Sequence, residues 1–300
     1  GDRERLVCCI ERGGGMNKRL ISSELRRGFT GYGFWLALLI GCAIAVWHGC
    51  CMEGAPVGFS HAGDVIYWNE KMMFPPNNVA KSLMGMTLDG QASVFMTVMP
   101  ILAALPMAAS LSADMRSGYI KSVLTRTTAK SYYVAKFIAV AATAAVVVTV
   151  PFLLDFFLVA MKVPYFQPYA YGGEIVLSGS FSLWGKLYFT CFPLYFVLAV
   201  LLVAVYGIIF ASFGLLFSFY IENRFLVLIA PFIIWMAITT IFSFLTFPEL
   251  MGANPFYFLM LAHPAGGSHH QAVSVLISTI IYAVLGIGGY FMAGRKRDIF

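Results

Sequence analysis

The sequence predicts an all-α protein that crosses a membrane several times. Two observations on composition support this prediction: 60% of the residues are hydrophobic, and only 11% are charged. A soluble domain has about 25% charged residues, so this composition excludes an ordinary soluble protein. The third observation is that the apolar residues gather in runs of about 20 or more, the length that a helix needs to cross roughly 30 Å of hydrocarbon.

Six such runs are the predicted membrane-spanning helices, and they lie near residues 32–51, 91–112, 134–161, 187–212, 225–247 and 271–293. Polar segments at 52–90 and 162–186 then form two loops on one side of the membrane. The segment 248–270 on that same side is too apolar for a solvated loop and too short to cross and return. It predicts a re-entrant or interfacial hairpin before the sixth span, packed on protein.

The basic residues define the orientation of these spans. Counted from Met16, thirteen Lys and Arg residues fall on the side of the two termini and four on the other side. The positive-inside rule therefore places both termini in the cytoplasm, which requires an even number of spans and agrees with six. The net charge of +6 follows from this topology and does not indicate a nucleic-acid partner.

The N-terminal region has two parts. Residues 1–15 lack an initiating Met and form a predicted appendage, so we expect one transmembrane domain over residues 16–300. Apolar residues then recur at helical spacing opposite basic ones, which predicts an amphipathic helix in the inner interface. Its apolar side holds Leu20, Ile21, Leu25 and Phe29, and its basic side holds Lys18, Arg19, Arg26 and Arg27. This helix is either a plain anchor or also a contact for a cytosolic partner.

The loop between the second and third spans is short, basic and helical in pattern. Residues 114–136 hold one acid and five cations, namely Asp114, Arg116, Lys121, Arg126, Lys130 and Lys136. The loop is too short for a domain and too regular in pattern for a bare turn. We therefore expect a short amphipathic element that docks on a cytosolic partner.

The sequence holds no pattern for catalysis or for a bound cofactor. It has no G-x-x-x-x-G-K-[ST] loop to cradle phosphates, no G-x-S-x-G turn and no H-E-x-x-H pair. The six cysteines lack zinc spacing, and His263, His269 and His270 have no acid or thiol at a spacing that completes a metal shell. We therefore expect no enzymatic activity, cofactor or metal in this chain.

Asp155 is the one acid well inside a predicted span. A carboxylate within a bilayer is costly and normally meets a partner or a water-filled cavity. Two interpretations follow: a structural contact near the outer interface, within reach of Lys162, or a substrate-facing position in a transport pathway.

Small residues repeat every four positions along the first span, at Ala37, Gly41, Ala45 and Gly49. Such a stripe allows two helices to approach closely. It predicts either close packing within the chain or the seam of a homodimer.

The stretch Asp114-Met-Arg-Ser-Gly-Tyr-Ile-Lys, followed by Leu124-Thr-Arg-Thr and Tyr132-Tyr-Val-Ala-Lys, resembles a motif of type-2 ATP-binding-cassette (ABC-2) permease subunits. The acid of that motif falls on Asp114, its glycine on Gly118 and its lysine on Lys136. The usual proline of the turn is absent. The layout of residues 16–300 is similar as well: an interfacial helix, six spans, a cytoplasmic coupling helix between spans two and three, and an apolar external hairpin before span six.

The resemblance implies one subunit of an exporter in the bacterial cytoplasmic membrane. In that family the permease forms a homodimer or a related heterodimer, and each copy seats its coupling helix in a groove of a separate ATPase subunit, which binds ATP and Mg²⁺. The coupling segment would comprise Asp114, Arg116, Gly118, Tyr119, Ile120, Lys121, Leu124 and Arg126. Its cations would pair with acids of the ATPase, and its apolar residues would fill the groove. The substrate would be hydrophobic or amphipathic, such as a peptide, an antimicrobial or a lipid-like compound.

Two other classes of function compete with this interpretation. A stand-alone membrane sensor or immunity protein would bind a ligand through the loop 52–90, whose aromatic residues include Tyr67, Trp68 and Phe74. An ion-coupled transporter ranks last, because it needs more ionisable groups within the membrane than Asp155 alone.

Overall fold

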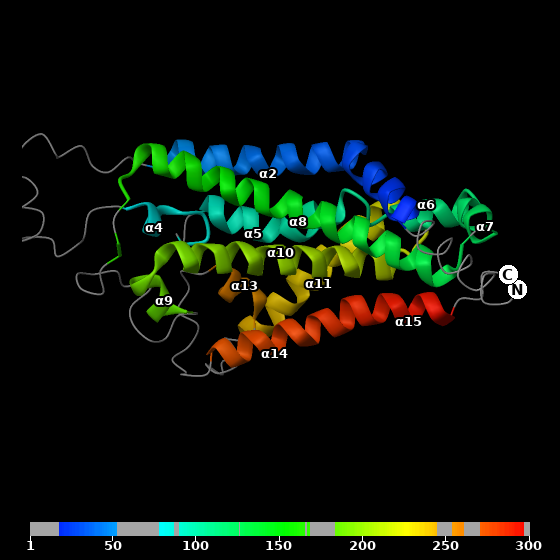
Figure 1. The fold of residues 1–300 in the computed structure, drawn as a ribbon. Coiled ribbons are helices and arrows are strands. Elements are labelled where there is room, and N and C mark those ends of the chain that lie inside the picture. The colour runs from blue at the N-terminus through cyan, green and yellow to red at the C-terminus, as the bar shows by residue number, and fades with distance from the viewer. Residues whose placement is uncertain are drawn as a thin grey trace, which may run out of the picture.

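The computed structural model describes residues 18–52, 78–86, 90–125, 127–165, 167–168, 184–244, 254–260 and 271–296. All regular secondary structure among these residues is helical, and the helices form an elongated bundle (Figure 1). The all-α prediction is confirmed. The predicted appendage 1–15, most of the loops 52–90 and 162–186, and Arg126 lie outside the described residues.

Five helices are long and apolar enough to cross a membrane. Four of them are α2 (Tyr32–Cys51), α8 (Ala129–Lys162), α10 (Phe192–Phe217) and α11 (Arg224–Phe244). The fifth, Val273–Arg295, runs through α14 (Gln271–Ala283), the π-helical turn η2 (Val284–Gly288) and α15 (Gly289–Lys296). These helices match the predicted spans one, three, four, five and six within a few residues, so the chain is a polytopic membrane protein.

The predicted second span is interrupted. Helix α5 (Gly90–Ala104) covers only 15 residues, about 22 Å at 1.5 Å per residue, which is shorter than the hydrocarbon core. A turn over residues 105–109 follows, and then α6 (Ser110–Arg116). Pro106 explains the break, because proline has no N–H to donate and disfavours a helical residue before it. The predicted second span near 91–112 therefore holds α5 and the start of α6, separated by a turn, in place of one continuous helix.

Helix α8 lies at the centre of the bundle. It packs against α2, α5 and α10 (Figure 1). Thr128 begins this helix by accepting a hydrogen bond from the backbone N–H of Ser131, which satisfies one of the free donors of the first turn. The last span reaches the same helix, since the hydroxyl of Tyr290 donates to the carbonyl of Tyr133 at 3.1 Å.

Residues 18–30 are helical and amphipathic, as predicted. Leu20, Leu25 and Phe29 pack against the main core, whereas the basic side chains at 18, 19 and 26 are exposed. Gly28 explains how close this helix lies, because a Cβ there would stand 2.6 Å from the sulfur of Met107. This contact fixes the helix on the turn between α5 and α6.

The apolar segment before the last span is described over residues 254–260 only. It contains α13 (Pro255–Leu259), which contacts α5, α10 and α14 and buries Leu259 and Met260 (Figure 1). This part of the predicted hairpin therefore packs on the bundle. The residues that would complete the hairpin lie outside the described part of the chain.

Candidate functional site

The coupling segment (residues 114–126) lies at one end of the bundle. That end carries α6, α7 (Tyr119–Leu124) and α15, and we call it the basic end; α4 (Val79–Ser82) and α9 (Gly185–Thr190) lie at the opposite end (Figure 1). Gly118 joins α6 to α7 with a φ of 71°, in the left-handed region that glycine enters at little cost. The predicted glycine therefore makes the bend between the two short helices.

The side chains of the coupling segment divide into an outer and an inner group. Arg116, Tyr119 and Lys121 are exposed and available to a partner. Ile120 is only 2% exposed, and Leu124 packs against the main core of the chain. The expectation that these two side chains fill a partner's groove is therefore wrong for Ile120 and weakened for Leu124.

Asp114 is buried and bonded within the chain. One of its carboxylate oxygens, Oδ1, lies 2.7 Å from Nη1 of Arg27. The other, Oδ2, accepts from Nζ of Lys136 at 2.5 Å and from the hydroxyl of Tyr132 at 2.8 Å. Asp114 is 1% exposed, so this member of the coupling segment does not itself reach a partner's surface. It anchors α6 instead.

Lys136 extends this arrangement to the N-terminal helix. Its Nζ also donates to Oε2 of Glu24 at 3.0 Å, and both side chains are buried. Glu24, Arg27, Asp114, Tyr132 and Lys136 together form what we call the charge cluster. Its two acids balance its two cations, which is the condition for burying charges without a large penalty. The cluster ties the N-terminal helix, α6 and α8 to one another.

Arg27 is the member of the cluster that reaches solvent. Burial alone would lower its pKa, but the hydrogen bond from Arg27 to Asp114 and the charges of Asp114 and Glu24 outweigh this effect and raise the pKa above its usual value. The guanidinium also lies 5.8 Å from the ring centre of Tyr119 on α7. Arg27 therefore connects the buried cluster to the outer surface of the coupling segment.

Most of this cluster was not predicted from the sequence. Asp114 and Lys136 were expected in the loop between two spans but not as a pair, and Arg27 was expected on the solvated side of its helix. Glu24 carried a usable signal, because it lies four residues after Leu20 and four before Gly28, on the apolar side. An acid on the apolar face of a helix indicates a buried cation as its partner.

Asp155 forms a second buried contact at the opposite end. Its Oδ1 lies 2.6 Å from Nδ1 of His48 on α2, and its Oδ2 accepts from the backbone N–H of Met84 at 2.7 Å. Lys162, the partner considered for Asp155, instead donates to the carbonyl of Cys50. Both oxygens of Asp155 are thus engaged within the chain. Of the two interpretations the structural one holds, and the substrate-pathway assignment is not supported.

Replacing Asp155 by Leu is expected to loosen residues 79–86. The N–H of Met84 would lose its acceptor, and an unpaired buried donor costs roughly 1–3 kcal/mol. Hydrogen–deuterium exchange should therefore speed up in that segment and remain unchanged in α7 at the far end. Unchanged exchange over 79–86 would contradict the anchoring role of Asp155.

The small-residue stripe of α2 lies against α8. Ala37 and Ala45 are fully buried. A Cβ on Gly41 would stand 2.6 Å from Cγ of Pro151, and one on Gly49 would stand 3.1 Å from Cβ of Leu158. The stripe therefore serves close packing within the chain. Because α8 covers it, the stripe is not exposed to form the seam of a dimer.

Buried donors near the start of α13 lack an acceptor among the described residues. They are Nε1 of Trp235 on α11 and Nδ2 of Asn254 at the start of α13. The Trp235 ring packs against Phe210 and Phe256, and Oδ1 of Asn254 accepts from the backbone N–H of Phe256. An unbonded buried donor is costly, so each of these two atoms calls for an acceptor from outside the described residues. No sequence pattern had pointed to these residues.

The described residues contain no group of three or more His, Cys, Asp or Glu side chains that could hold a metal ion. No protein-family model matches the sequence, and no curated protein matches it either. The family of the chain therefore remains a proposal.

Proposed function

We propose that this chain is the permease subunit of an ABC exporter of type 2, working with a separate ATPase subunit. One observation carries the proposal: Asp114, the first residue of the coupling segment, is bonded to Arg27 and Lys136 on two other helices. A force applied to α6 and α7 would therefore act directly on the N-terminal helix and on α8. Rigid connection of this kind is what transmission by rigid-body motion requires.

The outer face of the coupling segment supports the same proposal. Arg116 and Lys121 are exposed cations beside the exposed ring of Tyr119. Cations suit an acidic edge on a partner, and the aromatic ring adds apolar contact area. The partner would be an ATPase carrying ATP and Mg²⁺, present in two copies with two permease copies, at the cytoplasmic face of a bacterial membrane.

The substrate in this proposal is hydrophobic or amphipathic. The unbonded donor of Trp235 belongs to a ring that packs against Phe210 and Phe256, and Asn254 is bonded to the backbone of Phe256, which favours an apolar molecule with an uncharged oxygen acceptor over a charged one. These two residues replace Asp155 as the candidates for contact with substrate.

The first experiment is to isolate the tagged chain from its native host in mild detergent and identify bound proteins by mass spectrometry. An ATPase with a phosphate-binding loop should accompany it. A chain that is isolated alone, stable and monomeric would overturn the proposal and favour the stand-alone sensor or immunity protein.

Replacing Arg116 and Lys121 together by Gln is expected to abolish capture of that ATPase, or to lower its stimulation at least tenfold. Two exposed cations that meet acids at an interface account for such a loss. The matched control replaces Lys162 and Lys186 by Gln, because both are exposed at the opposite end and carry the same charge. Full capture and stimulation by the Arg116/Lys121 variant would contradict the assignment of the coupling segment.

A further inference from the structure

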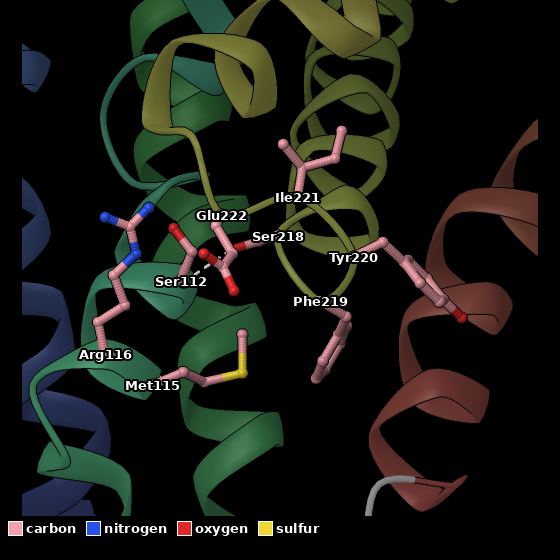
Figure 2. Close-up of a pocket in the computed structure, with 8 residues that line it drawn as sticks. All are labelled: Ser112, Met115, Arg116, Ser218, Phe219, Tyr220, Ile221 and Glu222. Carbon is pink, nitrogen blue, oxygen red and sulfur yellow. Dashed lines mark hydrogen bonds between the residues drawn. The ribbon is translucent and has the colours of Figure 1, made fainter.

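A cavity of about 320 Å³ lies beside the coupling segment. Its walls come from α6 and from the turn of residues 218–223 that joins α10 to α11. Figure 2 shows Arg116 reaching up from α6 on one side and Glu222 descending from the turn on the other. The cavity floor is held in place by Ser218, whose hydroxyl accepts from the backbone N–H of Ser112 at 2.7 Å.

The two charged residues of this cavity are not paired with each other. Both are exposed, and within the described part of the chain neither takes part in an ion pair at 4.0 Å or less. An ion pair between exposed side chains gains little free energy in water, so both groups remain available to a ligand that meets them together. The cavity therefore offers one free cation and one free anion to the same molecule.

The cavity lies at the level of lipid headgroups. Helix α10 ends at Phe217 and α11 begins at Arg224, so the turn between them marks the edge of the hydrocarbon layer. Tyr220 is 70% exposed in that turn, as expected for an aromatic residue at the interface, and Phe219 forms a buried apolar wall. A lipid beside α10 and α11 can thus place its headgroup in the cavity while its acyl chains stay in the bilayer.

We propose that this cavity binds the headgroup of a zwitterionic phospholipid with a primary amine, that is, a phosphatidylethanolamine. The guanidinium of Arg116 would donate to the phosphate, a group that it fits with parallel hydrogen bonds. The carboxylate of Glu222 would accept from the ammonium, which has N–H donors that a choline headgroup lacks. Such a lipid would bridge α6 and the α10–α11 turn and so hold the coupling segment against the bundle.

Two other lipid classes fit the cavity less well. A phosphatidylglycerol offers a phosphate to Arg116 but brings no cation to Glu222. A phosphatidylcholine offers both charges but no N–H donor for the carboxylate. Pockets of roughly 300–1,000 Å³ hold ligands larger than a phosphoethanolamine group, so the volume is sufficient.

Native mass spectrometry of the purified chain tests the proposal, with the three lipids carrying identical acyl chains. Phosphatidylethanolamine should bind roughly tenfold more tightly than phosphatidylcholine, as expected for a charge-assisted hydrogen bond. Glu222→Gln should abolish this preference, because the loss of the carboxylate weakens phosphatidylethanolamine binding more than phosphatidylcholine binding. Arg116→Gln should weaken binding of both lipids, and the control Arg224→Gln, an exposed cation outside the cavity, should change neither.

Equal binding of the two zwitterionic lipids to the unaltered chain would overturn the proposal. Retention of the preference by Glu222→Gln would overturn it as well. Tighter binding of phosphatidylglycerol than of phosphatidylethanolamine would also overturn it, because it would show that the cavity attracts anionic lipids in general. The result is separable from the proposed transport function, because Glu222→Gln leaves Arg116 and Lys121 in place. That variant should still capture the ATPase, whatever its lipid preference.

Discussion

Replacing Lys136 by Met is expected to lower the free energy of unfolding by about 3–5 kcal/mol, the usual cost of removing one partner from a buried ion pair. Lys136 is fully buried and serves both Glu24 and Asp114. Without it the buried carboxylate of Glu24 would lose its ion-pair partner among the described residues, and Asp114 would keep only Arg27. The measurement is denaturation of the purified chain in mixed micelles, followed by circular dichroism.

Two further variants separate charge from packing in this prediction. Lys130→Met is the matched control, since Lys130 is an exposed cation on the same helix, and its effect should stay within about 0.5 kcal/mol. Adding Glu24→Gln and Asp114→Asn to Lys136→Met should restore most of the lost stability, because no buried acid is then left unpaired. A Lys136→Met chain as stable as the unaltered one would show that the charge cluster does not hold the basic end together.

Replacing Gly41 by Leu is expected to destabilise the single chain without changing its oligomeric state. Even a Cβ at this position would stand 2.6 Å from Cγ of Pro151, so α2 must move away from α8. Overpacking a well-packed core costs about 1–3 kcal/mol of unfolding free energy. Because the whole helix must move, we expect a loss in the upper part of that range. Unfolding in detergent measures the first effect, and light scattering measures the mass of the assembly.

Gly288→Leu is the control for this variant, because the nearest atom to a Cβ at Gly288 is Cγ1 of Val284 at 3.8 Å. It adds the same side chain to a membrane helix without a clash, so its stability should change little. If Gly41→Leu instead left unfolding unchanged and halved the mass of the assembly, the stripe would be a dimer seam after all.

Local patterns predicted the helices well, because helix length in a bilayer depends on local hydropathy. The runs near 32–51 and 134–161 became α2 and α8 almost unchanged. The run at 91–112 is interrupted for a local reason, because Pro106 lies within it. Its apolar residues continue past the proline, so hydropathy alone joined two helices that the backbone separates.

The site was harder to predict, because its residues come from distant parts of the sequence. Glu24 and Lys136 are 112 positions apart, and His48 and Asp155 are 107 positions apart. Asp155 could be recognised as unusual from the sequence, but the partner of such a residue depends on which helices meet and on their rotation about their axes. The stripe at Gly41 shows the same limit: spacing indicated a close helix neighbour but not whether that neighbour was α8 or a second copy.

The sequence by itself determined that this chain is a multi-pass helical membrane protein, where its apolar helices lie and which of its segments between two spans is short and basic. These properties follow from hydropathy, charge and backbone preference, which act over a few residues at a time. Only the tertiary structure decided that Asp114 and Ile120 face inward, that Asp155 holds the residues around Met84, and that Arg116 and Glu222 share a cavity. Those assignments depend on which side chains touch one another and which are shielded from water. Both the contacts and the burial result from the packing of the whole bundle.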